Sequence, residues 1–152
     1  MIGPDTFAYR RAFPHLQKDG KTYFVTFCAN RRRVLPESAR NIALQCCLHD
    51  NEFTYWLHCV VIMPDHVHLL ITPYEGWSLE TIMKRVKGNS SRLINLALGR
   101  RGAFWQHESF DHIVRSDESL RKKAEYICEN PVRAGLVANA RDYRWTWNRY
   151  WL

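Results

Sequence analysis

The sequence lacks any apolar run close to the roughly 18 residues that a membrane-spanning helix needs. Residues 1–21 contain no apolar signal core followed by a small-residue cleavage site. Cys-x-x-Cys pairs are also missing, and the five cysteines are odd in number and follow no framework spacing. These absences favour a cytoplasmic protein that has no membrane partner and whose thiols are reduced and buried.

Acidic residues are few relative to basic ones. There are 15 aspartates and glutamates against 22 lysines and arginines, which gives a net charge of +7. Such an excess favours a polyanionic partner through counterion release. Six tryptophans and seven tyrosines could stack on unpaired bases, although most of them are expected to fill the core.

Repeats, low-complexity stretches and linkers are missing as well, so residues 1–152 are interpreted as one domain, with about 138–152 as an aromatic and basic C-terminal arm. Clusters of β-branched and aromatic residues predict strands at 22–29, 53–63, 66–72 and 110–115. Helices are predicted at 36–49, 79–98 and 118–129.

The ends of the predicted helices carry recognisable signals. Ser78 is a plausible cap for the second helix, Ser116 or Asp117 for the third, and Pro131 limits how far the third continues. The order β-α-β-β-α-β-α predicts an α+β fold. It would be a ferredoxin-like split β-α-β with a central antiparallel sheet and helices packed on it.

The tripeptide His66-Val67-His68 is the first candidate for chemistry. Side chains alternate along a strand, so both imidazoles project to one side while Val67 faces the other. Two adjacent imidazoles form half of a divalent-metal site. Two ordinary strand histidines are the alternative, and a zinc site that includes Cys59 is a less favoured one.

Tyr126 and Asn130 form the second candidate, because residues four apart share one face of a helix. Tyr126 could present a phenolic nucleophile, and Asn130 an amide oxygen to a metal ion. The alternative is a tyrosine that packs at the helix end and an asparagine that stops the helix.

The two candidates make chemical sense together. A phenol with a pKa near ~10 is a poor nucleophile at neutral pH, so it needs a strongly activated electrophile. A cation bound by His66, His68 and Asn130 could polarise a phosphodiester oxygen. Tyr126 would then attack phosphorus, expel a 3′-hydroxyl and remain linked to the DNA 5′ end, which suits strand transfer better than degradation.

Several motifs now carry a specific resemblance, covering roughly residues 20–150. They are residues 63–70 (MPDHVHLL), 126–137 (YICENPVRAGLV), 105–106, 110–112, 23–26 and 30–31. In this order they resemble the REP-associated tyrosine transposases, a branch of the single-tyrosine HUH transposases.

The resemblance implies a ferredoxin-like fold and cleavage of single-stranded DNA beside short palindromic hairpins. It also implies a Mg²⁺ or Mn²⁺ site made by His66, His68 and a third ligand. Insertion-sequence members have a glutamine four residues after the tyrosine, whereas this sequence has Asn130, as in the REP-associated branch. Those members act as dimers, so the resemblance leaves a monomer and a homodimer open.

Basic residues near these motifs are candidates for phosphate contacts. They are Arg31, Arg32, Arg33, Lys84, Arg85, Lys87, Arg92, Arg115 and Arg133. The leading hypothesis is a metal-dependent single-stranded DNA endonuclease and strand transferase, nucleoid-associated in the cytoplasm. Its rivals are a non-catalytic hairpin-DNA binding protein and a metal-dependent hydrolase that uses water instead of Tyr126.

Overall fold

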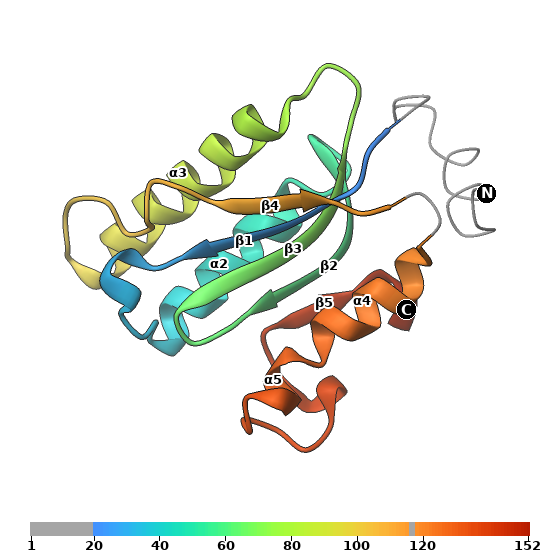
Figure 1. Ribbon diagram of the computed structural model, residues 1–152. Helices are drawn as coiled ribbons and strands as arrows, with labels where there is room; N and C mark the ends of the chain where they lie inside the picture. The colour runs from blue at the N-terminus through green and yellow to red at the C-terminus, as the bar shows by residue number, and fades with distance from the viewer. Residues whose placement is uncertain (1–19, 116–117) are drawn as a thin grey trace.

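The computed structural model describes residues 20–115 and 118–152 (Figure 1). The strands are β1 (Tyr23–Cys28), β2 (Tyr55–Ile62), β3 (His66–Pro73), β4 (Phe110–Ile113) and β5 (Thr146–Asn148). The α-helices are α2 (Glu37–His49), α3 (Leu79–Leu98), α4 (Leu120–Cys128) and α5 (Asn130–Arg133). The 3-10 turns are η1 (Asn30–Arg32), η2 (Ala140–Asp142) and η3 (Arg149–Trp151). None of the described helices is both long enough and apolar enough to cross a membrane.

The five strands form one antiparallel sheet in the order β4-β1-β3-β2-β5. β1 and β2 both pair with β3 and are joined through α2, which is a split β-α-β unit. The predicted α+β, ferredoxin-like fold is therefore confirmed. A fifth strand extends it, because residues 146–148 of the predicted C-terminal arm pair with β2.

The helix ends follow the local chemistry of the sequence. Ser78 accepts a hydrogen bond from the Thr81 amide and starts α3, and Gly99 with φ 63° ends it. α4 starts after Ser119, whose side chain accepts from the Lys122 amide. The caps expected at residues 116 and 117 lie outside the described residues. α4 ends at Cys128, and α5 follows with Pro131 in its first turn.

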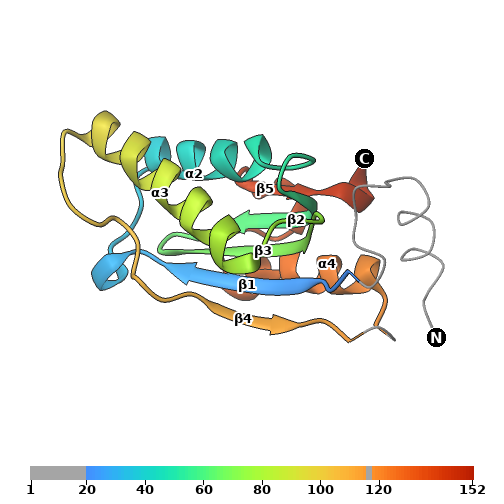
Figure 2. The same cartoon turned by 90° about the horizontal axis from the view of Figure 1, so that it is seen from above.

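Helices cover both faces of the sheet (Figure 2). The α2/α3 face carries Val25 and Phe27 of β1, and Lys87 of α3 lies over the Phe27 ring with its Nζ 5.8 Å from the centroid. The opposite face, called the α4 face, carries Asn148 of β5, whose amide donates to Cys128 Sγ of α4 at 3.5 Å. All eight residues of β2 are buried because α2 packs on one side of this strand and α4 on the other.

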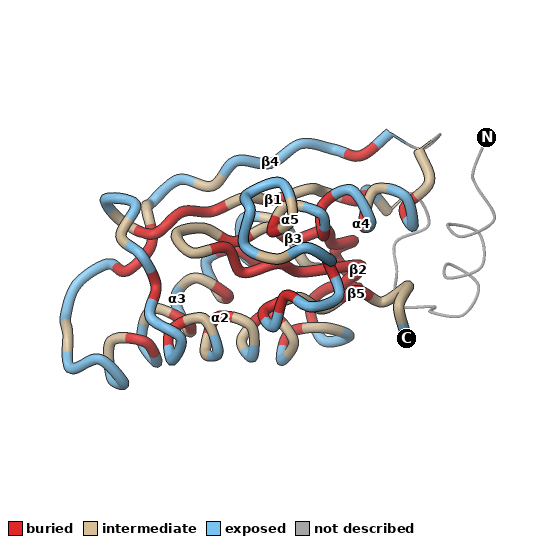
Figure 3. The backbone as a smooth tube through the Cα atoms, turned by 90° about the horizontal axis from the view of Figure 1, so that it is seen from below, coloured by how far each residue is buried: buried red, intermediate tan, exposed pale blue. Residues whose placement is uncertain are grey.

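Coverage of the α4 face is incomplete. α4 packs mainly on β2 and β5, at one side of the sheet. At the other side all four residues of β4 are exposed, and the trace in Figure 3 is mostly pale blue there. The part of the α4 face formed by β1 and β4 is therefore accessible from outside.

Candidate metal and nucleophile site

His66 and His68 project from the α4 face of β3, as the alternation of a strand predicts. Their Nε2 atoms lie 3.1 Å apart. Two imidazole nitrogens that each bind one ion at roughly 2.0–2.2 Å lie about this far from one another. The pair therefore has the geometry of two ligands of a single cation.

A polar group holds the far nitrogen of each ring. Asp65 Oδ1 lies 2.6 Å from His66 Nδ1, and Thr26 Oγ1 lies 2.8 Å from His68 Nδ1. A hydrogen bond donated by Nδ1 fixes the tautomer and leaves the Nε2 lone pair for a metal. The surroundings of both rings thus fit a divalent cation at the Nε2 side.

Electrostatics also keep His68 in the neutral, metal-binding form. Burial is the main cause, followed by electrostatic interactions with His66 and Arg133, and together they lower the pKa of His68 to about 3. Burial by itself would raise the pKa of Asp65. Hydrogen bonds from Arg32 and His66 outweigh burial and leave this pKa below its usual value. Asp65 is therefore a carboxylate that links Arg32, at 2.9 Å, to a candidate metal ligand.

Tyr126 of α4 is 58% exposed, so its phenol is accessible. Two cations flank the ring: Lys123 Nζ is 5.6 Å and the Arg133 guanidinium carbon 4.4 Å from its centroid. Arg133 also donates to the Tyr126 carbonyl oxygen at 2.8 Å. A phosphate beside the phenol would therefore lie near two positive charges.

Contacts across the α4 face connect this helix to the histidines. Lys123 Nζ lies 5.5 Å from the centroid of Phe24 on β1, and the Phe24 ring lies 5.3 Å from that of His68. Arg133 is close enough to His68 to lower its pKa. The nucleophile candidate and the histidine pair therefore lie on the same face of the sheet.

Asn130 begins α5, whereas Tyr126 belongs to α4, which ends at Cys128. The two residues therefore do not share one face of a continuous helix, contrary to what the spacing predicts. Its Nδ2 donates to the Ile127 carbonyl at 2.7 Å, which orients the amide and leaves Oδ1 as its accepting end. Within residues 20–115 and 118–152, no hydrogen bond joins Asn130 to either histidine. The amide oxygen of Asn130 stays a predicted third ligand.

The zinc alternative receives no support from the described residues. Cys59 is fully buried and lies opposite Leu70 and Asn148 in the sheet. Burial raises its pKa well above the usual thiol value, which disfavours the thiolate that zinc needs. In the described part of the chain, no three His, Cys, Asp or Glu side chains are grouped as a metal site.

The predicted phosphate contacts separate into groups on different parts of the fold. Near the histidine end of the sheet or beside Tyr126 are Arg31, Arg32, Arg33 and Arg133. On α3, which packs on the other face, are Lys84, Arg85, Lys87 and Arg92. Arg115 follows β4 and is exposed. The assignment of these residues to DNA stays a prediction.

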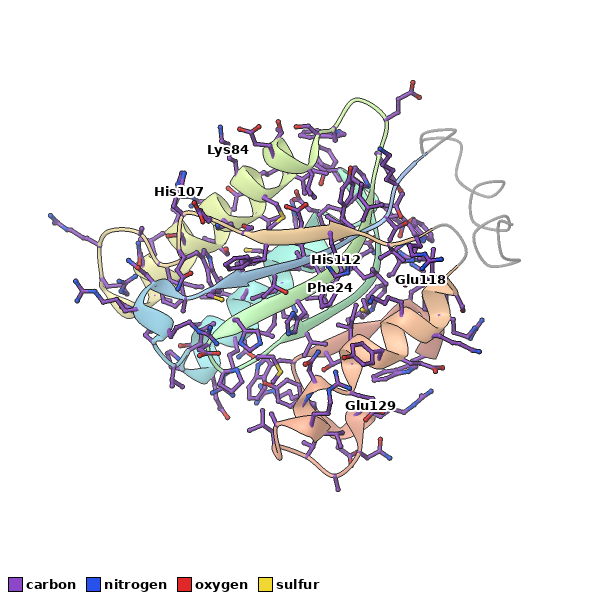
Figure 4. The ribbon with its side chains drawn as sticks, in the orientation of Figure 1. Phe24, Lys84, His107, His112, Glu118 and Glu129 are labelled. Carbon is purple, nitrogen blue, oxygen red and sulfur yellow. The ribbon has the colours of Figure 1, made fainter. Side chains whose placement is uncertain are left out.

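Two of the α3 cations already have partners inside the protein. Arg85 Nε is paired with the buried Asp50 carboxylate at 2.9 Å. Lys87 Nζ donates to the His107 carbonyl at 3.0 Å and to Ser109 Oγ at 3.1 Å, and this anchors the loop that precedes β4. Lys84 is exposed, and Figure 4 shows it on the same side of the molecule as His107.

Sequence reasoning missed four residues of this site: Thr26, Asp65, Phe24 and Lys123. Phe24, Thr26 and Asp65 lie inside the motifs 23–26 and 63–70, but the sequence assigned them no role of their own. Lys123 had a local signal, because a residue three before Tyr126 shares its helical face. Asp65 precedes His66 directly, but its bond to Arg32 spans 33 positions. Thr26 and His68 are 42 positions apart and meet only through strand pairing.

Comparisons with known proteins agree with this fold and these motifs. A curated protein of Haemophilus influenzae, provisionally named a REP-associated tyrosine transposase, is 27% identical over 149 residues. The match covers 89% of this chain and 81% of that protein. The REP-associated tyrosine transposase of Escherichia coli K12 is 23% identical, with coverage of 89% and 78%.

Solved structures show the same fold. A structure of a REP-associated tyrosine transposase bound to a REP hairpin matches with a TM-score of 0.67 and 23% identity, covering 84% of this chain and 76% of that one. A provisionally named transposase from Deinococcus radiodurans matches with a TM-score of 0.52 and 20% identity, covering 75% and 92%. Residues 17–130 match the family described as "Transposase IS200 like". The chain therefore belongs to the IS200-like transposase family.

Proposed function

We propose that this protein is a metal-dependent single-stranded DNA endonuclease and strand transferase. It acts at short palindromic or hairpin DNA through a covalent 5′-phosphotyrosine intermediate. The observation that carries the proposal is the pair of Nε2 atoms 3.1 Å apart on the face of the sheet that also holds the Tyr126 helix.

The cation is Mg²⁺ or Mn²⁺, held by His66, His68 and the Asn130 amide oxygen. Imidazole nitrogen and amide oxygen are suitable ligands for such ions, and the polar partners of both Nδ1 atoms support ligation. When bound, the ion supplies positive charge at a non-bridging phosphate oxygen. By holding the ion, the side chains of His66, His68 and Asn130 keep the scissile phosphate close to Tyr126.

Tyr126 Oη attacks the phosphorus in line. The new Oη–P bond forms as the bond from phosphorus to the 3′-oxygen breaks, and the departing oxygen takes up a proton to become a 3′-hydroxyl. The phenolic proton leaves to solvent. Lys123 and Arg133, which flank the tyrosine ring, stabilise the charge that accumulates on the phosphate. Attack by a second 3′-hydroxyl reverses the step and joins two strands.

The DNA class follows from the charge and from the relatives. The net charge of +7 suits a polyanion. One similar structure is a transposase bound to a REP hairpin, and by analogy the partner proposed for this chain is single-stranded or hairpin DNA. Contacts from Arg31, Arg32 and Arg133 are expected near the histidine end of the sheet.

A covalent adduct is the decisive measurement. Wild-type protein incubated with labelled hairpin DNA, a single-stranded flank and Mn²⁺ should give a band shifted to the mass of protein plus DNA on a denaturing gel. Tyr126→Phe should retain DNA binding but give no adduct, because only the attacking oxygen is lost. Tyr23→Phe removes a phenol of β1 and is the matched control.

The two rival functions give different results in the same assay. A non-catalytic hairpin-binding protein would bind the DNA without cleaving it. A hydrolase would cleave the DNA in both the wild type and Tyr126→Phe and would form no adduct. An adduct that persists in Tyr126→Phe would assign the nucleophile to another tyrosine.

A further inference from the structure

The exposed part of the α4 face has an unusual composition for a sheet edge. Phe110 on β4 is 62% exposed, and His112 is exposed on the same side of the strand. Strand pairing sets Phe110 opposite Thr26 and His112 opposite Phe24 of β1. We call Phe24, Phe110 and His112 the aromatic platform; Figure 4 shows Phe24 and His112 beside one another on neighbouring strands.

The platform continues into the candidate metal site. The rings of His112 and Phe24 lie 5.3 Å apart edge to face, and those of Phe24 and His68 lie 5.3 Å apart. Phe110 pairs with Thr26, whose hydroxyl holds His68. An aromatic surface therefore runs from the open edge of the sheet to one of the two candidate metal ligands.

Positive charge accompanies these rings. Lys123 Nζ lies between the platform and the nucleophile, 5.5 Å from the Phe24 centroid and 5.6 Å from the Tyr126 centroid. Arg133 is a second cation at Tyr126, with its guanidinium carbon 4.4 Å from the ring centroid. Rings beside cations fit a strand whose bases are unpaired, since the bases stack on the rings while the phosphates pair with the cations.

We propose that the aromatic platform is a stacking subsite for unpaired bases of the DNA strand next to the scissile phosphate. The inference rests on the proposed function, because the strand is defined by its approach to Tyr126 and His68. Stacking accepts any base, so the platform holds the strand in the site without reading its sequence. An apolar surface of a protein partner or of a second copy of the chain would not pair with the ammonium group of Lys123 above the Phe24 ring, whereas a phosphate would.

The test compares two single strands of equal length, one oligothymidylate and one abasic. Their affinities are measured by fluorescence anisotropy in chelator, so that the strand stays intact. Both probes have the same phosphates, and their affinity ratio therefore reports the bases alone. Wild-type protein should prefer oligothymidylate by about fivefold or more, the effect expected from one stacked base.

Substitutions then locate the stacking. The double variant Phe110→Ala/His112→Ala should bring the ratio close to one. Both side chains are exposed, so the fold should persist. Ile113→Ala is the matched control, because Ile113 is 49% exposed on the same strand but on the opposite face. Lys123→Gln should weaken both probes equally and leave the ratio unchanged.

Failure of the platform and failure of the chemistry are distinguishable. The platform is overturned if the wild type shows no preference for bases, or if the ratio survives in the double variant. It is also overturned if the double variant changes only the oligomeric state. An adduct in the wild type together with any of these results leaves the proposed function intact. If the affinity ratio depends on Phe110 and His112 but the wild type forms no covalent adduct with DNA, the platform is supported and the proposed covalent chemistry is contradicted.

Discussion

β2 and β4 belong to the same sheet, yet all eight residues of β2 are buried and all four of β4 are exposed. β2 lies between α2 and α4 and even buries a histidine, His58, which needs partners inside the protein. β4 pairs with one neighbour and no helix of the described residues covers its α4 face. The packed parts of the sheet are therefore scaffold, whereas the open part of the α4 face is a surface on which chemistry is accessible.

Neighbouring residues of β3 give the strongest test of this contrast. His68 faces the α4 side and Leu69 the packed side. His68→Ala should reduce metal-dependent cleavage to background while the unfolding midpoint in urea changes little. Leu69→Ala should lower the free energy of unfolding by about 2–5 kcal/mol. The fraction that remains folded should still cleave.

Excess chelator on the wild type should reproduce the His68→Ala phenotype. Full cleavage in chelator would contradict the metal site on the α4 face. A loss of folding in His68→Ala as large as in Leu69→Ala would show that the two faces do not differ in their contribution to stability.

Salt should separate the two groups of cations. If roughly six phosphates are neutralised on a single strand, raising salt from 50 to 200 mM should weaken binding by about 10²- to 10³-fold. Arg133→Gln, on the Tyr126 side, should flatten the logarithmic plot of affinity against salt by about 0.7. Arg92→Gln, on α3 at the other face of the sheet, should change the slope less than Arg133→Gln. A flat response in the wild type would show that the basic excess does not contact DNA.

Asp65 tests whether the metal site depends on its supporting shell. Asp65→Asn removes the carboxylate from His66 Nδ1 and from Arg32 while keeping the shape of the side chain. The affinity for Mn²⁺, measured by calorimetry without DNA, should fall by about 10- to 100-fold. Asp111→Asn is the control, because Asp111 lies on β4 at the face of the sheet opposite the histidines. Unchanged Mn²⁺ affinity in Asp65→Asn would contradict the role given to this residue.

The smallest expected effect concerns the covered half of the α4 face. His58 is fully buried, with Tyr150 on one ring nitrogen at 2.9 Å and Thr72 on the other at 2.9 Å. Burial, and then Arg149, lowers its pKa to about 3 from 6.5. The unfolded chain thus takes up the proton first as pH falls, so the stabilisation is present above pH 6.5 and is lost below it.

Between pH 7.5 and 5.5 the expected loss from His58 is about 1.4 kcal/mol in the free energy of unfolding. Urea unfolding at both pH values should show this loss in the wild type and a smaller one in His58→Gln. His68 adds a change of the same sign in both proteins. His107→Gln is the exposed control, and an identical pH dependence in wild type and His58→Gln would refute the assignment.

The residues that the sequence identified are those whose relations are local. Alternation along a strand sets His66 and His68 on one side. The helical spacing of Tyr126 and Asn130 was less informative, because α4 ends at Cys128 and Asn130 begins α5. The start of α3 followed from Ser78 because capping involves only neighbouring residues. The α+β order followed from such local patterns.

Only the tertiary structure decided which of these pieces meet. Lys123 reaches Phe24 because α4 packs on that face of the sheet, and Thr26 reaches His68 through strand pairing across 42 positions. The C-terminal segment became strand β5 because β2 had a free edge, and Arg149 fastens it by stacking on Trp56 at 3.3 Å. Arg85 and Lys87, two predicted phosphate ligands, also contact Asp50 and the loop before β4, which the sequence did not indicate. Such partners depend on chain segments far apart in sequence, whose packing no local pattern encodes.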